Sequence, residues 1–214
     1  MAKNLYFRYG AMNCGKSTRV LQEAHNYEQY DHKVVVTKPG IDTKGKDHIV
    51  SRLGVQREAD FVITPEDRVL EKLAPVVARH EIKCVFIDEA QFLTVPQVEE
   101  LAWGVVPQDG LNIAVIAYGL RLDFQANGFP ASEKLMLEAD KVEEMPAICP
   151  CGDHKARFNA RMVDGEYTFE GDQVAIDGEG VSYVSLCRDC FRREASKSEA
   201  GRTALMNAGN LVLV

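Results

Sequence analysis

Short apolar runs alternate with longer amphipathic stretches along roughly the first two thirds of the chain. The clearest runs have the length of a strand and span Leu5–Tyr9, Lys33–Thr37, Val85–Ile87 and Asn112–Ala117. Strand-like runs separated by helical stretches are typical of a parallel sheet whose strands are connected by crossover helices. The pattern therefore predicts an α/β fold, with a doubly wound sheet and flanking helices.

Two amphipathic stretches predict helices that cover this sheet. The first follows the first strand-like run, and its apolar face carries Val20, Leu21, Ala24 and Tyr27. The second lies between positions 66 and 80, and its apolar face carries Val69, Leu70, Leu73 and Val77. Both sets recur at the spacing of one helical face. A third helix is expected to start near Thr94, a residue type that caps helix N-termini.

Two segments and the last third of the chain depart from this pattern. Residues 40–59 contain glycine and lack a clean period, which predicts a mobile loop, and residues 119–132 lack a period as well. Both loops are candidate covers for a substrate. After Pro146 the chain changes to short alternating runs flanked by pairs of cysteines, which predicts a small β-ribbon domain. We therefore expect a first domain over residues 1–146, a second over 147–191 and a flexible tail over 192–214.

The composition and net charge argue against several classes of protein. Hydrophobic residues make up 46% and charged residues 27%, and no apolar run is long enough to span a bilayer. The N-terminus lacks the pattern of a signal peptide, so a cytoplasmic protein without a membrane partner is expected. The 25 basic and 32 acidic residues give a net charge of −7, which disfavours nucleic acid as a partner.

The residues from Gly10 to Ser17 carry the strongest motif in the chain. They read GAMNCGKS and satisfy the pattern G-x-x-x-x-G-K-[ST], between a predicted strand and a predicted helix. Glycines in such a loop let backbone N–H groups turn toward phosphate oxygens, and the helix N-terminus adds partial positive charge. Lys16 then reaches the outer phosphates, and the hydroxyl of Ser17 is a ligand for Mg²⁺. The motif predicts a site for ATP and Mg²⁺.

A second motif, an acidic strand end, supports the same interpretation. The apolar run Val85–Ile87 ends in Asp88 and Glu89, at the edge of a parallel sheet where ligands collect. Asp88 suits the acidic residue that holds the Mg²⁺ shell, and Glu89 is positioned to face the reacting group. A kinase needs a base for the accepting hydroxyl, whereas an ATPase needs a residue that orients water. Glu89 fits either role.

Four of the six cysteines lie in two close pairs, which predicts a metal site. The pairs are Cys149 with Cys151 and Cys187 with Cys190, and four thiolates are a common ligand set for a structural Zn²⁺. In a reducing compartment such pairs favour metal binding over disulfides. Because only one residue separates the first pair, His154 is kept as a substitute ligand. The preferred site has four cysteines, and the second choice has three cysteines and His154.

Taken together, these motifs resemble the type II, or cellular-type, thymidine kinases, in their bacterial form. The resemblance rests on the loop with Met12 after its first glycine, the run from Asp88 to Phe92, the run from Tyr118 to Phe124, and the segment Tyr183–Cys190. These occur in the family's order over roughly residues 5 to 190. The resemblance implies a RecA-like α/β domain, a zinc-bearing lasso domain and ATP-dependent phosphorylation of thymidine or deoxyuridine. It also implies a homotetramer and feedback inhibition by dTTP.

The resemblance also implies roles for individual residues. Glu89 would be the catalytic base. The residues implied to bind ATP and Mg²⁺ are Gly10, Asn13, Gly15, Lys16, Ser17, Thr18, Asp88 and Gln91. The residues implied to bind the nucleoside are Met12, Phe92, Leu120, Phe124, Phe129, Asn159, Val174, Ile176, Gly178 and Tyr183. Asp42-Thr43-Lys44 departs from the family's usual Asp-x-Arg, which replaces a fork-shaped phosphate contact by a point charge.

Two other classes of function remain open at the level of sequence. The run from Asp88 to Gln91 also resembles a helicase box, which would indicate an ATP-driven engine on nucleic acid. Such engines need two RecA-like domains and a basic track, and this chain has neither the length nor the charge for them. The other alternative is a non-catalytic module that nucleotide regulates and that docks through its zinc ribbon.

Overall fold

The computed structural model describes residues 3–40, 47–173 and 180–209. The chain divides into two compact units, each built from separate stretches of sequence. The first unit comprises Met1–Tyr9, Gly15–Gly119 and Pro130–Glu144. The second comprises Gly10–Cys14, Leu120–Phe129 and Met145–Val214. The predicted boundary near residue 146 corresponds to the last crossing from one unit to the other, and two short loops before it also belong to the second unit.

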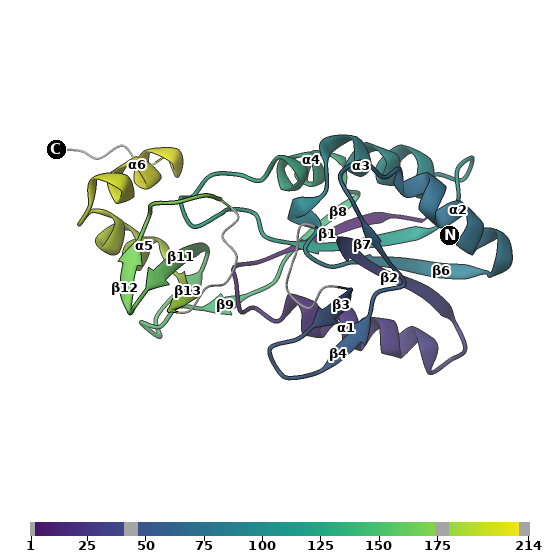
Figure 1. Ribbon diagram of the computed structural model, residues 1–214, viewed down its shortest axis with the longest axis horizontal. Helices are drawn as coiled ribbons and strands as arrows, with labels where there is room; N and C mark the ends of the chain where they lie inside the picture. The colour runs from purple at the N-terminus through teal and green to yellow at the C-terminus, as the bar shows by residue number, and fades with distance from the viewer. Residues whose placement is uncertain (1–2, 41–46, 174–179, 210–214) are drawn as a thin grey trace. The chain divides into compact units, whose positions relative to one another are not determined.

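A parallel sheet forms the centre of the first unit (Figure 1). In the described part of the chain its strands are hydrogen-bonded, in order, as β5 (Phe61–Ile63), β2 (Lys33–Pro39), β6 (Ile82–Ile87), β7 (Ala114–Gly119), β1 (Leu5–Tyr9) and β8 (Lys141–Glu144). Each neighbouring pair is parallel. The predicted α/β fold is therefore confirmed.

The sequence of the central strands explains why they form. Parallel strands covered on both faces are apolar at successive positions rather than at alternate ones. In β6 the side chains from Cys84 to Ile87 are all 0% exposed, and in β2 those from Val34 to Val36 are buried. The strand expected at Asn112–Ala117 is instead Ala114–Gly119, because Asn112 has a φ of 55° and lies in the preceding turn.

Helices cover both faces of this sheet (Figure 1). α1 (Lys16–Glu28) packs on one face, where Tyr27 meets Phe86 edge to face, and it buries Val20, Leu21 and Ala24 as predicted. α2 (Val69–Arg79), α3 (Val95–Glu100) and α4 (Pro130–Glu138) pack on the other face. Their apolar sides and the strands share one core cluster, which includes Leu5, Phe7, Val85, Ile87, Leu73, Val98 and Leu135.

Two short helices flank α3. η1 (Ala90–Phe92) is a 3₁₀ turn directly after the acidic pair, and η2 (Leu101–Val105) is a π-helical turn that continues α3. Thr94 caps α3 as predicted. Its hydroxyl accepts a hydrogen bond from the backbone N–H of Gln97, and the side chain of Gln97 accepts one from the N–H of Thr94.

The prediction that residues 40–59 form a loop without secondary structure was wrong for the part that the structure describes. β3 (His48–Val50) and β4 (Gln56–Glu58) form an antiparallel hairpin. Each strand is three residues long, which is too short for an alternating pattern to stand out. The hairpin buries Ile49 to 1% exposure and lies against α1. Residues 41–46, which include Asp42, Thr43 and Lys44, lie outside the described residues.

The second unit contains the predicted small β domain. β12 (Glu166–Thr168), β11 (Phe158–Val163) and β13 (Val181–Leu186) form an antiparallel sheet, and β9 (Ala147–Ile148) pairs with β10 (Lys155–Ala156). The region after residue 191, expected to be a flexible tail, is largely helical in the part that the structure describes. α5 (Arg188–Ala195) and α6 (Glu199–Asn207) occupy this region, and Ser198 caps α6 through the N–H of Gly201.

A compact core explains why this segment is ordered. Phe158 stacks on Phe191 with ring centroids 4.6 Å apart, and Phe169 meets Phe191 edge to face. Ala204 and Leu205 of α6 are each 1% exposed within the same cluster. The polar and small residues that suggested a tail therefore form the outer faces of two helices, whose buried sides carry Phe191, Ala195, Ala204 and Leu205.

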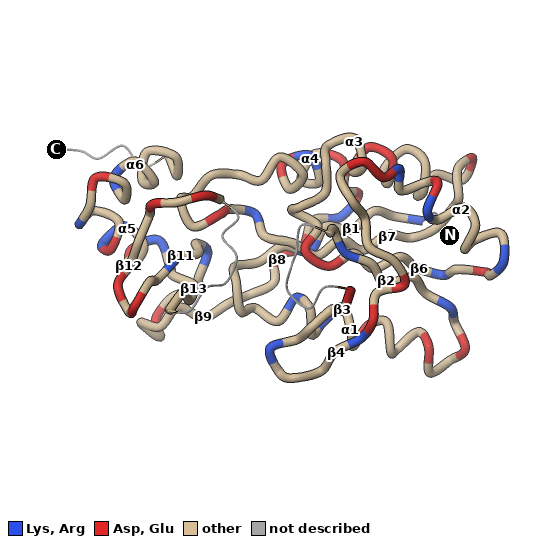
Figure 2. Tube along the Cα trace, in the orientation of Figure 1, with Lys and Arg blue, Asp and Glu red and all other residues tan. Residues whose placement is uncertain are grey.

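Charged residues of both signs are interspersed along the described trace (Figure 2). None of the helices formed by residues 3–40, 47–173 and 180–209 has the length and apolar character needed to cross a membrane.

Candidate active site and cysteine cluster

The glycine-containing motif lies where the sequence predicts it, between the end of β1 at Tyr9 and the start of α1 at Lys16. Asn13 and Gly15 adopt left-handed backbone conformations, with φ of 65° and 84°. Glycine and asparagine are the residues that tolerate this conformation best. Gly10 is required for a different reason, since a Cβ there would lie 2.7 Å from the carbonyl oxygen of Met145.

The first turn of α1 suits an anion. It contains no acidic residue, and its exposed N–H groups and helix dipole favour negative charge at this end. Lys16 begins the helix and is 7% exposed. Thr18, one turn position further, shares a hydrogen bond of 2.6 Å with the hydroxyl of Ser51 in the β3–β4 hairpin. Within the first unit, Lys16, Ser17 and Thr18 therefore lie at one helix end, as a phosphate site requires.

Asp88 lies at the carboxyl end of β6 and is brought to the same place. Its carboxylate accepts a hydrogen bond from the side chain of Ser17 and is 3% exposed. Burial, and then the charge of Glu89, raise the pKa of Asp88 to about 7. Among the described residues its Oδ1 atom has no hydrogen-bond partner. A buried carboxylate oxygen left without a partner, beside a hydroxyl, fits a divalent cation with oxygen ligands.

Glu89 follows at once and has an unusual backbone conformation. Its φ is 51°, in the left-handed region that a glutamate rarely adopts, and the chain then turns into η1. The side-chain amide of Gln91 donates a hydrogen bond of 2.5 Å to Oε2 of Glu89, and Gln91 itself is 3% exposed. Backbone strain of this kind persists where the surroundings hold a functional side chain in place. Gln91 thus orients Glu89.

Lys38 is a candidate that sequence reasoning missed. It lies near the carboxyl end of β2, the neighbour of β6, and is 1% exposed. Because side chains alternate along a strand, Lys38 follows Val36 on the sheet face where Asp88 follows Phe86. A lysine is rarely buried this deeply unless it is paired with another group. The available signal was a lysine two residues after the apolar run Val34–Val36, at the edge where ligands collect.

The residues predicted for the nucleoside are divided between the two units. Phe92 belongs to the first unit, at the end of η1. Met12, Leu120, Phe124, Phe129, Asn159 and Tyr183 belong to the second. Leu120, Phe124 and Phe129 are 5%, 2% and 4% exposed, so the segment 120–129 carries three buried apolar side chains, two of them aromatic. Val174, Ile176 and Gly178 lie outside the described residues, and the contacts predicted for them stay predictions.

Asp123 organises the segment that carries these aromatic residues. Its carboxylate accepts hydrogen bonds from the backbone N–H groups of Gln125 and Asn127, each at 2.8 Å, and from the amide of Gln173 at 3.0 Å. The guanidinium of Arg161 lies over the ring of Phe124, 5.4 Å from its centroid. The segment predicted as a loop at residues 119–132 is thus held by the hydrogen bonds of Asp123, and its last residues form the start of α4.

The two cysteine pairs come together in the second unit, as predicted. The sulfur atoms of Cys149, Cys151, Cys187 and Cys190 all lie within 4.8 Å of one another. Three of the four are buried, and Cys151 is exposed. The neighbouring Cys187 and burial raise the pKa of Cys190 to about 12, so ionising this thiol is unfavourable without a nearby positive charge. A bound cation supplies that charge, and four convergent sulfurs fit a tetrahedral Zn²⁺.

The elements around the sulfurs explain their convergence. The turn between β9 and β10 is closed by a hydrogen bond of 3.1 Å from the N–H of Cys149 to the carbonyl of His154. Cys187 caps α5 and accepts from the N–H of Cys190, which places both sulfurs at one helix end. His154 is exposed and lies in a separate group with Cys151 and Asp153. The geometry favours the site with four cysteines.

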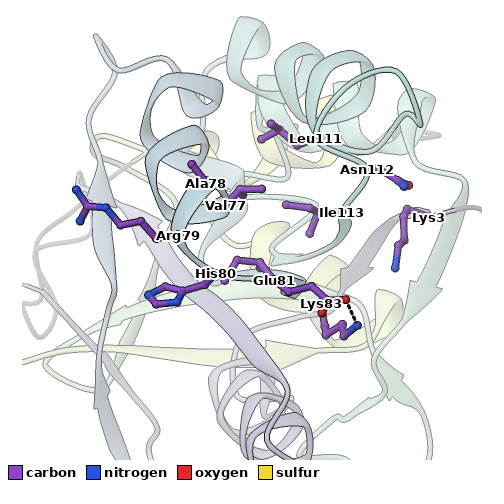
Figure 3. A pocket seen from close by; sticks show the side chains of 11 residues that line it. Lys3, Val77, Ala78, Arg79, His80, Glu81, Lys83, Leu111, Asn112 and Ile113 are labelled. Atoms are coloured by element: carbon purple, nitrogen blue, oxygen red, sulfur yellow. Dashed lines mark hydrogen bonds and ion pairs between the residues drawn. The ribbon is translucent and has the colours of Figure 1, made fainter.

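A cavity of about 540 Å³ opens elsewhere in the first unit (Figure 3). It lies at the amino ends of β6 and β7, where Ile82 and Ile113 line it, together with Val77 and Leu111. Asp88 and Glu89 follow the carboxyl end of β6 and so lie at the opposite edge of the sheet. The cavity is not the site that the motifs predict.

This fold and this site define a P-loop nucleotide-binding α/β protein with a cysteine-rich second unit. A sequence profile described as thymidine kinase matches residues 3–191. The chain is 44% identical over 187 residues to the thymidine kinase of Enterobacteria phage T4, covering 86% of this chain and 93% of that one. The chain therefore belongs to the thymidine kinase family.

Bacterial relatives show the same extent of similarity. The thymidine kinase of Ruegeria pomeroyi (strain ATCC 700808 / DSM 15171 / DSS-3) is 42% identical over 193 residues, or 90% of this chain and 94% of that one. The thymidine kinase of Haemophilus influenzae (strain ATCC 51907 / DSM 11121 / KW20 / Rd) is 42% identical over 199 residues, or 92% and 100%. The resemblance drawn from the motifs is confirmed.

Proposed function

We propose that this protein transfers the γ-phosphoryl group of ATP to the 5′-hydroxyl of thymidine, giving ADP and dTMP. The observation that carries the proposal is the hydrogen bond between Ser17 and Asp88, which unites the phosphate-binding helix end with the acidic end of β6. Glu89, held by Gln91, adjoins this pair. A site with these groups has a place for the triphosphate, a place for a cation and a base.

The residues of the first unit would bind and orient the triphosphate. The N–H groups at the start of α1 and the ammonium group of Lys16 would hold the phosphate oxygens. Ser17 and Asp88 would hold Mg²⁺, which would offset the negative charge of the phosphate groups. Lys38, at the end of the neighbouring strand, would add a second positive charge on the same face of the sheet.

Glu89 would accept the proton in the transfer step. The 5′-oxygen of the nucleoside forms a bond to the γ-phosphorus while its proton passes to the carboxylate of Glu89. The bond between the γ-phosphorus and the bridging oxygen breaks, and ADP leaves with that electron pair. The hydrogen bond from Gln91 fixes which oxygen of Glu89 stays available. A positioned general base contributes about 10²–10⁴ in rate.

The second unit would supply the residues for the nucleoside base. Tyr183 of β13 and the buried rings of Phe124 and Phe129 are the proposed contacts there, and Phe92 is the contact from the first unit. The cysteine cluster would hold Zn²⁺ in a structural role, because the core around it is small. We further propose a cytoplasmic homotetramer that dTTP inhibits as the end product of the salvage route.

One assay tests this proposal against the alternatives. Purified protein is incubated with ATP, Mg²⁺ and radiolabelled thymidine, and the nucleotide product is separated and counted. Labelled dTMP at a rate that depends on both ATP and Mg²⁺ supports the proposal. ATP hydrolysis stimulated by nucleic acid would instead indicate a helicase-like ATPase. The absence of both activities would indicate a binding module. Unlabelled deoxyuridine and other nucleosides, added as competitors, report the preference for the base.

A further inference from the structure

Both backbone polar groups of Met12, in the middle of the phosphate-binding loop, are hydrogen-bonded to a pair of side chains. The backbone N–H of Met12 donates to Oδ1 of Asn159 at 2.7 Å. The hydroxyl of Ser185 donates to the carbonyl oxygen of Met12. Asn159 in β11 and Ser185 in β13 are direct cross-strand partners. The loop is thus bonded to one rung of the second unit's sheet.

Both side chains are committed to this contact. Asn159 is 3% and Ser185 is 6% exposed, so water cannot replace their bonds. The other end of the Asn159 amide donates to the carbonyl of Leu122 at 2.8 Å. An N–H donor on one side and a carbonyl acceptor on the other allow only one orientation of the amide. Asn159 therefore has its polar atoms satisfied within the protein, before any contact with a nucleoside.

A second bond extends the contact along the loop. The side-chain amide of Asn13 donates to the backbone carbonyl of Tyr183 at 3.3 Å, two residues before Ser185 on β13. Asn13 is one of the loop residues with a left-handed backbone. The loop conformation that aims later N–H groups at phosphate is thus fixed by contacts to β13 at two successive residues.

The strands that hold the loop lead directly to the cysteine cluster. Ser185 lies two residues before Cys187, the ligand candidate that begins α5. Asn159 follows Phe158, whose ring stacks on Phe191 of α5 at 4.6 Å. The rung that bonds Met12 is therefore supported by the same packing and the same cysteines that order the second unit.

We propose that Asn159 and Ser185 are positioning residues that set the conformation of the phosphate-binding loop, so that nucleotide affinity depends on the integrity of the cysteine-bearing unit. The inference rests on the proposed binding of ATP by this loop. It assigns to Asn159 a role toward the nucleotide in addition to the one predicted toward the nucleoside. Ser185 acquires a role that neither the motif nor the resemblance indicated.

Three variants on the two strands test the proposal. Asn159→Leu keeps the branched shape of the side chain and removes both hydrogen bonds, whereas Asn159→Asp keeps an acceptor for the Met12 N–H. Ser185→Ala removes only the bond to the Met12 carbonyl. Ser182→Ala on the same strand is the matched control, because Ser182 is exposed. Zinc content and the thermal midpoint of each variant show whether the second unit remains folded.

The first readout is amide hydrogen exchange of the Gly10–Cys14 segment, which needs no nucleotide. Losing a buried hydrogen bond opens the loop, so exchange should become about tenfold faster in Asn159→Leu and less so in Asn159→Asp and Ser185→Ala. Ser182→Ala should match the unchanged protein. Unaltered exchange in Asn159→Leu would contradict the proposed positioning role of Asn159, whether or not the protein binds ATP.

The second readout is the steady-state KM for MgATP and for thymidine, with kcat. The proposal expects the KM for MgATP to rise about tenfold in Asn159→Leu and about threefold in Ser185→Ala, since one or two bonds that shape the loop are lost. The rise in the KM for MgATP in the double variant should be smaller than the product of the two single rises, because both bonds hold the backbone of the same residue, Met12. Faster exchange with an unchanged KM for MgATP would overturn the link to nucleotide. If the unchanged protein fails to phosphorylate thymidine, the proposed function is wrong. The exchange data still test whether Asn159 and Ser185 set the loop conformation.

Discussion

The side chain of Ser17 donates a hydrogen bond to the carboxylate of Asp88, and so joins the first turn of α1 to the carboxyl end of β6. β7 lies between β1 and β6 in the sheet, so the strands that precede these residues are not neighbours. The contact is made by the helix, which crosses the sheet face above β7 and β6. It leaves Oδ1 of Asp88 buried and without a partner within the described residues, which prepares the site for a cation.

The carboxylate of Glu89 gives the first prediction. Glu89→Gln keeps the shape of the side chain and removes its ability to accept a proton. We expect kcat to fall by about a hundredfold or more, while the affinity for MgATP stays close to that of the unchanged protein. Steady-state kinetics and calorimetric binding of MgATP measure the two. Glu66→Gln, at an exposed position, is the control. A loss of kcat below roughly tenfold would remove Glu89 from the role of base.

Asp88 gives a prediction about pH and stability. Burial and Glu89 raise its pKa to about 7, well above the ordinary value of 3.8. The folded protein therefore holds a proton that the unfolded chain releases, and stability falls as pH rises from about 4 to about 7. In Asp88→Asn this cost is absent.

The stability of Asp88→Asn is measured by thermal unfolding in magnesium-free buffer at pH 5 and pH 8. At pH 8 the variant should be more stable by about 1 kcal/mol or more, roughly 2–4 °C for a chain of this size. At pH 5 the gain should shrink, because the unchanged protein is then protonated at Asp88. Activity should be lost at both pH values. An equal gain at pH 5 and pH 8 would contradict the assigned pKa.

The buried lysine of β2 gives a third prediction with its own control. Lys38→Met removes a positive charge from the face that carries Asp88, whereas Lys33→Met removes one from the exposed amino end of the same strand. We expect the KM for MgATP to rise about tenfold or more in Lys38→Met, the effect of losing one charge-assisted contact of about 1.4 kcal/mol. Lys33→Met should leave it unchanged. Equal kinetics for the two variants would exclude Lys38 from the phosphate site.

The cysteine cluster predicts a metal content. Elemental analysis of the purified protein should give about one zinc per chain, the occupancy of a closed site of four thiolates. Cys187→Ser and Cys190→Ser should lose the metal and unfold the second unit, because structural zinc contributes on the order of 10 kcal/mol. His154→Ala should keep it, since His154 is grouped with Cys151 and Asp153 rather than with all four sulfurs. Retention in Cys151→Ser with loss in His154→Ala would indicate the mixed site instead.

The helix that replaces the expected tail gives a prediction about packing. Leu205 is 1% exposed and Met206 is 66% exposed, so two apolar neighbours on α6 differ strongly in burial. Leu205→Ala should lower the free energy of unfolding by about 2–5 kcal/mol. Met206→Ala should change it by less than about 0.5 kcal/mol, as exposed substitutions do. Denaturant unfolding followed in the second unit measures both, and equal effects would show that α6 does not depend on this core.

Much of the first unit could be predicted from the sequence. The runs at Leu5–Tyr9 and Val85–Ile87 are apolar enough to be strands in any fold, and the helix through Val20 and Ala24 has an unambiguous period. The motif from Gly10 to Ser17 required only its local context. The β3–β4 hairpin and α6 escaped prediction because three-residue strands and a polar helix with few apolar residues carry too little periodicity.

The sequence by itself determined the chemistry that is local: a phosphate-binding loop, an acidic strand end and two pairs of cysteines. Hydrogen bonding and side-chain spacing within a few residues specify such features, so they can be recognised one at a time. Only the tertiary structure decided which of them meet. It brought Ser17 to Asp88, buried Lys38 on the same face, and bonded Met12 to Asn159 and Ser185. Such pairings depend on strand order and register, which arise from the packing of the whole chain rather than from any short segment.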